Sequence, residues 1–293
     1  MNAYHNGHLF AAYGAGDSVE LWSSASESRQ RIVETGQGTV SRVVFRDQTD
    51  EFATAGRDGT LICWSSSGEK QRALKLESPI TDVVLVQHAK YAVISTANGG
   101  LWQADDQGHV TQFPGAGASV ARMLGIPDTT SVGVAYTNGD VDILDTESKR
   151  ITRVLHATRG IRDIAFARDS RTVAIADDDD VVHVGHLDTG YWSDQRVRWM
   201  TFAARARMVA LTPDGIVVAL CSDGTVWLYV PSEQKWLCLP TGTADLTGIA
   251  MSPDGLAAVT FDSDGRIVWI DLDLARKSLE ATSNHPPEGM IRK

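Results

Sequence analysis

The chain has 293 residues with 27 basic and 37 acidic side chains, so its formal net charge is −10. Hydrophobic residues make up 43% and charged residues 22%, which is typical of a globular protein and argues against a disordered chain. The acidic balance disfavours nucleic acid or an anionic membrane surface as a partner, because both require clustered lysine and arginine.

The cysteine content and the N-terminal residues predict a cytoplasmic protein. Cys63, Cys221 and Cys238 are widely spaced and form neither a disulfide framework nor a Cys-x-x-Cys metal pair, which fits a reducing compartment. Residues 1–7 lack the basic start and the apolar run of a signal peptide. No stretch approaches the roughly 18 consecutive apolar residues that a membrane-spanning helix requires.

A turn tetrad, in which a turn residue precedes an aliphatic residue by three positions, recurs along the chain. Its seven copies are separated by 40 to 45 residues and begin at Gly16, Asp58, Asn98, Asn138, Asp178, Asp223 and Asp264. An apolar run precedes each copy, as at 51–56, and an alternating segment follows it, as at 61–64. Asp-Gly and Asn-Gly pairs adopt the positive φ of two-residue hairpin turns, so each tetrad predicts a β-hairpin.

Each hairpin is flanked by two further predicted strands. A first strand with the pattern V-x-x-V-x-F precedes it, as at 40–45, and a more polar fourth strand follows it, as at 71–76. Four antiparallel strands in each of seven repeats, without helical periodicity, predict an all-β, seven-bladed β-propeller that spans 1–293 as a single domain. The repeat spacing predicts that the chain termini close the ring in blade one, through 290–293, 1–4 or both. We expect this blade to be the least stable.

The repeats resemble the WD40 family along essentially the whole chain, most closely at 18–22, 58–64 and 252–255. The resemblance implies a propeller that acts through contacts with other proteins. No Trp-Asp dipeptide occurs, and the Gly-His pair of the family is missing from the loop before each first strand. The Asp–His–Ser/Thr–Trp network that fastens many WD40 blades is therefore not expected, and apolar strand packing should hold the blades together.

Several polar groups have the residue types of catalytic or metal sites. Asp177–Asp180 and Asp262–Gly265 could hold calcium, but both fall where the repeat needs a turn, and a solvated acidic turn is the simpler interpretation. His183 and His186 have a metal-like spacing, yet an odd separation on a strand sends their side chains to opposite faces. No nucleophile elbow or phosphate-binding loop occurs. We therefore predict no catalytic residue, no metal site and no cofactor.

A column of charged residues precedes the buried part of the first strands. Its members alternate in sign and are Arg42, Asp82, Arg122, Asp163 and Arg207. In WD40-like rings this position faces the mouth of the central channel. The column predicts either salt bridges between neighbouring blades, of about 0–1 kcal/mol each if exposed, or a surface that recognises a charged peptide.

A second candidate surface is an aromatic-basic patch in blade five. Its members are residue types enriched at interface hot spots, namely Tyr191, Trp192, Arg196, Arg198 and Trp199. Trp236, on the outer strand of blade six, could extend it. The alternative is that Trp199 and Phe202 pack between blades and that Trp192 is the exposed residue.

These features predict a non-enzymatic scaffold or adaptor that is one subunit of a larger hetero-complex. It would bind proteins or peptide segments through the channel-mouth loops and the aromatic-basic patch. The alternatives are a propeller hydrolase of the lactonase type with a central metal, and a small-molecule sensor with a pocket in the channel. Three arginines in the column argue against a central metal, because they would repel a divalent cation.

Overall fold

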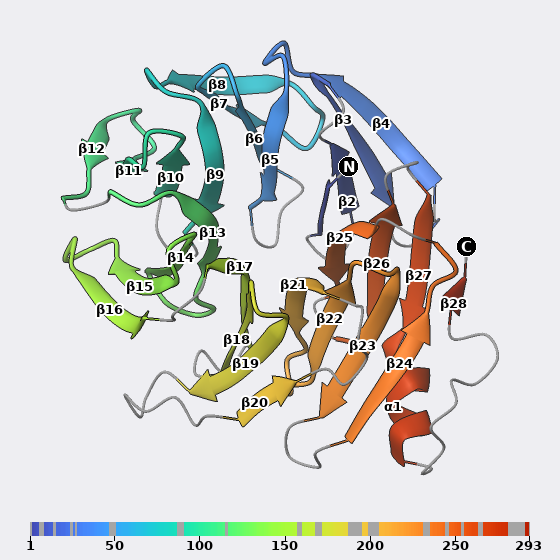
Figure 1. The fold of residues 1–293 in the computed structure, drawn as a ribbon. Coiled ribbons are helices and arrows are strands. Elements are labelled where there is room, and N and C mark those ends of the chain that lie inside the picture. Colours follow the sequence, from blue (N-terminus) through green and yellow to red (C-terminus); the bar gives the residue numbers. More distant parts are fainter. Residues whose placement is uncertain are drawn as a thin grey trace. The chain divides into compact units, whose positions relative to one another are not determined.

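A computed structural model of the chain contains seven four-stranded antiparallel sheets, which we letter A to G in chain order (Figure 1). The residues that it describes are 2–5, 9–13, 16–23, 26, 28–46, 51–86, 91–114, 117–156, 160–167, 172–186, 195–198, 205–230, 235–243, 246–252, 255–262, 266–280 and 291–292. The chain falls into two compact units, Asn2–Gly160 with sheets A to D and Ile161–Lys293 with sheets E to G. The organisation of 1–293 as one domain stays a prediction.

In the first unit, the strands of each sheet are hydrogen-bonded in chain order. Sheet A comprises β1 (Asn2–His5), β2 (Leu9–Tyr13), β3 (Ser18–Ser23) and β4 (Ser28–Glu34). Sheet B comprises β5 (Val40–Phe45), β6 (Phe52–Gly56), β7 (Thr60–Trp64) and β8 (Lys70–Lys75). Sheet C comprises β9 (Ile80–Leu85), β10 (Ala92–Thr96), β11 (Leu101–Ala104) and β12 (Val110–Gln112). Sheet D comprises β13 (Val120–Gly125), β14 (Ser131–Tyr136), β15 (Asp140–Asp145) and β16 (Ile151–His156).

The second unit repeats this strand order three times. Sheet E comprises β17 (Ile161–Phe166), β18 (Thr172–Asp177), β19 (Val181–His186) and β20 (Gln195–Arg198). Sheet F comprises β21 (Ala206–Leu211), β22 (Val217–Cys221), β23 (Thr225–Val230) and β24 (Lys235–Pro240). Sheet G comprises β25 (Leu246–Met251), β26 (Ala257–Asp262), β27 (Ile267–Asp271) and β28 (Ile291–Arg292).

The turn tetrads connect the second and third strands, as the sequence predicts. In sheet B, Gly59 has a φ of 88°, and a Cβ atom there would lie 2.6 Å from the Leu76 carbonyl oxygen. Both the conformation and the close approach therefore require glycine. Asp58 Oδ1 closes the turn by accepting hydrogen bonds from the amide of Thr60 at 2.9 Å and from its hydroxyl at 2.7 Å.

Apolar packing between neighbouring sheets holds each unit together, as predicted. Every residue of the second strands β6, β10 and β22 is buried, because these strands carry small or apolar side chains on both faces. The buried clusters join sheets A and B, B and C, and C and D in the first unit, and E and F, and F and G in the second. The outermost strand β8 is largely exposed. The polar fourth strands therefore form the outer edges.

The two terminal segments complete different sheets. Residues Asn2–His5 form β1 and pair with β2, so the N-terminal segment supplies the first strand of sheet A, one of the predicted possibilities. Ile291–Arg292 form β28 and pair with β27 as the fourth strand of sheet G. The expectation that the C-terminal segment could join blade one is therefore wrong, because Ile291–Arg292 extend the last sheet.

A helix, α1 (Leu272–Glu280), lies between β27 and β28 and was not predicted. Asp271 Oδ1 caps its start by accepting a 2.9 Å hydrogen bond from the Leu274 amide. Leu272, Ala275 and Leu279 are buried in the cluster shared by sheets F and G. None of the helices in the described part of the chain has the length and apolarity to cross a membrane.

A buried hydrogen-bond network in sheet B corrects the prediction that no such network forms. Gln37, 1% exposed in the loop before β5, donates from Nε2 to the carbonyl oxygens of Thr60 at 2.7 Å and Thr54 at 3.1 Å. Its Oε1 accepts from the Thr54 hydroxyl at 2.6 Å, and that hydroxyl oxygen accepts from Trp64 Nε1 at 2.9 Å. The Thr60 hydroxyl bonds to Asp58. In this sheet, glutamine stands where the WD40 network has histidine.

Candidate functional site

The strand register aligns four members of the predicted charge column. The first strands of sheets B to G have a bulge after their first residue, and the column residue follows that bulge at Arg42, Asp82, Arg122 and Asp163 in sheets B to E. In sheets F and G the same place is taken by Met208 and Gly248. The assignment of Arg207 to this column is therefore wrong, since Arg207 is the bulge residue between Ala206 and Met208.

Arg42 and Asp82 form a buried ion pair between sheets B and C. Arg42 Nε lies 3.0 Å from Asp82 Oδ1, and the two residues are 8% and 4% exposed. Arg42 also donates to the Tyr13 hydroxyl of sheet A at 3.4 Å, and Asp82 Oδ2 accepts from the Met123 amide of sheet D at 2.7 Å. Burial raises the pKa of Asp82, while Arg42 and the Met123 and Val83 amides oppose that rise. This pair thus connects four sheets.

Asp163 makes the same kind of connection in the second unit. It is 3% exposed, and its Oδ2 accepts a 2.9 Å hydrogen bond from the Val209 amide of the next sheet. Both aspartates therefore fasten the first strand of one sheet to the first strand of the next. Arg207 is exposed. Recognition of a peptide by the column stays a prediction, but Arg42, Asp82 and Asp163 are occupied inside the protein.

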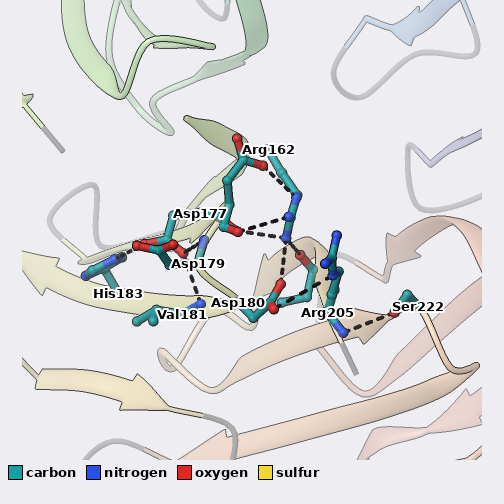
Figure 2. A network of polar contacts seen from close by, with 10 residues as sticks. Arg162, Asp177, Asp179, Asp180, Val181, His183, Arg205 and Ser222 are labelled. Carbon is teal, nitrogen blue, oxygen red and sulfur yellow. Dashed lines mark hydrogen bonds and ion pairs between the residues drawn. The ribbon is translucent and has the colours of Figure 1, made fainter. Parts of the chain in front are cut away.

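The acidic run 177–180 carries its own counterions (Figure 2). Arg162 Nε lies 2.8 Å from Asp178 Oδ1, and Arg162 Nη1 lies 3.1 Å from Asp180 Oδ1. Arg162 also donates to the carbonyl oxygens of Asp177 at 2.9 Å and Ala206 at 3.3 Å, which ties the turn to sheet F. Arg205 Nε is 3.8 Å from Asp180 Oδ2. Two arginines thus offset part of the negative charge of this turn, and Arg162 is the member that the sequence did not reveal.

Asp177 differs from the rest of the run because it is buried and points toward β19. His183 Nε2 donates to its Oδ2 at 2.7 Å, and the amides of Asp179 and Val181 donate to its Oδ1 at 2.9 and 3.0 Å (Figure 2). Burial by itself raises the pKa of Asp177, but these hydrogen bonds outweigh it and hold the pKa below its ordinary value. His183 is therefore occupied by a carboxylate, and the side chain of His186 lies outside the described residues.

The lowered pKa of Asp177 predicts a loss of stability in acid. A carboxyl group whose folded pKa lies below its unfolded pKa stabilises the fold above the unfolded value of 3.8, and this stability is lost as the pH falls through the folded pKa. As the pH is lowered below about 4, we expect the free energy of unfolding to decrease less steeply in Asp177→Asn and in His183→Ala than in the wild type. Urea unfolding at a series of pH values in this acidic range measures the slope. Wild-type slopes in both variants would contradict the assignment.

The structure describes only some members of the second candidate surface, the aromatic-basic patch. Tyr191, Trp192 and Trp199 lie outside the described residues, whereas Arg196 and Arg198 belong to β20, the outermost strand of sheet E. Trp236 lies on β24, the outermost strand of sheet F, and is 48% exposed. Trp236 is thus exposed, and its part in this patch stays a prediction.

Two carboxylates of sheet D form a further cluster that the sequence analysis missed. Asp140 and Asp142 are buried one strand period apart on β15. Arg153 on β16 binds both, with Nη1 2.6 Å from Asp140 Oδ2 and Nε 2.8 Å from Asp142 Oδ1. His156 Nδ1 lies 2.5 Å from Asp140 Oδ1. The Asp-x-Asp spacing is the signal for this cluster, and the contacts with Arg153 and His156 join β15 to β16.

The described residues contain no group of three or more His, Cys, Asp or Glu side chains that could hold a metal ion. Asp262, from the second candidate metal loop, is buried, and its Oδ1 accepts from the Arg266 amide at 2.8 Å. Cys221 is fully buried in β22. Cys63 is half-buried and lines a cavity between sheets B and C.

No family model matches the sequence, and no match is found among curated proteins. Among solved structures, the chain is similar to the Cps50 (Swd1) beta-propeller domain of Myceliophteria thermophila, with a TM-score of 0.78 and 13% identity. The similarity covers 91% of this chain and 95% of that domain. The seven four-stranded sheets and this likeness show that the chain folds as a β-propeller, the fold that its WD40-like repeats predict.

Proposed function

We propose that this propeller is a non-enzymatic adaptor that binds partner proteins through the outermost strands of sheets E and F. The observation that carries the proposal is Trp236, a large aromatic side chain exposed on an outer strand. Tryptophan and arginine are the residue types that dominate binding energy at protein interfaces. β20 supplies Arg196 and Arg198 on the outermost strand of the neighbouring sheet.

Trp236 is held in place before any partner arrives. Its ring centroid lies 5.0 Å from that of Trp227, which is 2% exposed. Trp227 Nε1 donates to the Thr225 hydroxyl at 3.0 Å, and that hydroxyl bonds to Asp223 at 2.6 Å. Because the supporting ring is fixed, binding at Trp236 would lose little side-chain entropy. We infer that the partner presents apolar surface with acidic groups, as part of a hetero-complex.

Affinity purification of the tagged chain from its native host tests this function. We expect a stoichiometric partner protein whose affinity falls by roughly 30-fold or more in Trp236→Ala, the loss typical of an interface hot spot. Arg196→Ala combined with Arg198→Ala should also weaken the complex. Ile32→Ala is the matched control, because Ile32 is 46% exposed on β4, the outermost strand of sheet A.

Two results would count against the proposal. Full retention of the partner by Trp236→Ala and by the double arginine variant would move the interface elsewhere on the chain. The absence of any stoichiometric partner of the wild-type chain would contradict the adaptor function itself.

A further inference from the structure

A cavity of about 300 Å³ lies between sheets B and C, inside the first unit. This volume is at the lower end of the range of ligand-binding sites. Leu61 and Leu74 from sheet B and Leu85 from sheet C form part of its apolar wall, and Cys63 lies beside them. The cavity can therefore take one apolar group of about the size of a leucine or phenylalanine side chain.

The mouth of this cavity carries a cation that is weakly engaged. Arg72 projects from β8 and is exposed, and its Nη1 reaches the Asp105 carbonyl oxygen of sheet C at 3.5 Å, the limit for a hydrogen bond. A ligand carboxylate can replace this contact with a shorter, charge-assisted pair.

The carboxylates at the mouth already have partners. Glu51 lies 3.3 Å from Arg46 Nε, and Asp106 accepts from Gln107 Nε2 at 3.4 Å. The carboxylate of Asp105 accepts from the amides of Gln107 and His109 at 2.9 and 2.8 Å, and it lies 3.0 Å from His109 Nδ1. The combination of an apolar wall and an available guanidinium favours a ligand with an apolar group and an adjacent negative charge.

We propose that this cavity binds an apolar side chain of a partner protein whose neighbouring acidic residue pairs with Arg72. This site consists of residues of sheets B and C, whereas the proposed function rests on residues of sheets E and F. A negative result at one surface therefore leaves the other open to its own test.

Cys63 provides a reporter on the wall of the cavity. Burial raises the pKa of its thiol, and Arg46 and Arg72 oppose that rise, so both guanidiniums act on this thiol. A probe disulfide reacts with the Cys63 thiolate to give a mixed disulfide and one equivalent of released thiolate. The Cys238→Ser background removes the other half-buried thiol, and Cys221 stays buried.

Disulfide capture followed by intact mass tests the chemistry of the site. The probes are cystamine derivatives that carry a phenyl ring with a carboxylate, the same ring with a carboxamide, or a carboxylate without a ring. We expect the first probe to be captured about two- to fivefold more than either of the others, as one exposed ion pair allows. Arg72→Gln should abolish the preference over the carboxamide. Lys70→Gln, an exposed cation on the same strand, should preserve it.

Equal capture of the three probes, or a preference that survives Arg72→Gln, would overturn the proposal. Competition identifies the source of the ligand. We expect the capped peptide acetyl-Ser-Leu-Glu-Ser-amide to reduce capture more than its Leu-Gln counterpart does. Competition by 4-methylpentanoate without competition by the peptide would assign the site to a free carboxylic acid and reject a partner protein.

Discussion

Replacement of Gln37 by alanine is expected to lower the free energy of unfolding by about 2–4 kcal/mol, because several buried polar groups each lose a hydrogen-bond partner. The Gln37 amide serves the carbonyl oxygens of Thr54 and Thr60 and the hydroxyl of Thr54. That hydroxyl in turn accepts from the indole of Trp64. A single truncation therefore weakens contacts along the loop before β5 and the strands β6 and β7.

Gln37→His distinguishes the network from simple packing. Histidine occupies this place in the WD40 network that the repeats resemble, and its ring can accept from Thr54 while donating toward Thr60. We expect this variant to stay within about 1 kcal/mol of the wild type. Urea unfolding measures both variants. Gln112→Ala, an exposed glutamine of β12, should change stability by less than about 0.5 kcal/mol. Equal stability of Gln37→Ala and Gln112→Ala would contradict the account.

The sequence was sufficient for the strands because their signals are local. The Asp-Gly and Asn-Gly turns, with apolar residues alternating on either side, locate the hairpins, and the repeat spacing gives the number of sheets. The same local reasoning missed Gln37, since the network was sought through histidine. It also missed α1, although Leu272, Ala275 and Leu279 follow a helical period behind a capping Asp271.

The site was harder to predict because it depends on register and on contacts between sheets. A bulge in the first strands of sheets B to G shifts the alignment by one residue, and sequence alone does not show whether Arg207 or Met208 faces the column. The burial of Arg42 and Asp82 follows from the packing of neighbouring sheets, which composition does not reveal. The cavity beside Cys63 likewise arises where two sheets meet. Trp236 was predictable because an outer strand exposes alternate residues.

Removal of the charge of Arg42 should produce a large loss of stability. Arg42→Met is expected to lower the free energy of unfolding at neutral pH by about 3–5 kcal/mol, because it leaves the buried carboxylate of Asp82 without its cation. Methionine is the residue that sheet F has at the equivalent place, Met208, so the change is compatible with the strand. Arg207→Met is the control, because Arg207 is exposed and adjacent to that place in sheet F.

The loss should depend on pH in a way that a simple packing defect would not. Burial already raises the pKa of Asp82, and Arg42 opposes that rise, so the pKa rises further in Arg42→Met. A carboxyl group with a raised folded pKa binds its proton more tightly in the folded state, so its contribution to stability grows as the pH falls toward the unfolded pKa. Arg42→Met should therefore recover part of its lost stability between about pH 7.5 and pH 5.

The double variant Arg42→Met with Asp82→Asn completes the test. It removes the isolated charge, and the asparagine oxygen can still accept from one of the Val83 and Met123 amides. We expect it to be more stable at neutral pH than Arg42→Met alone and to lack the pH-dependent recovery, since neither remaining group titrates there. Urea unfolding of the wild type, both single variants and the double variant at the two pH values gives the coupling energy of the pair. Additive losses, or equal losses at both pH values in Arg42→Met, would show that Arg42 acts through packing and that its charge contributes little.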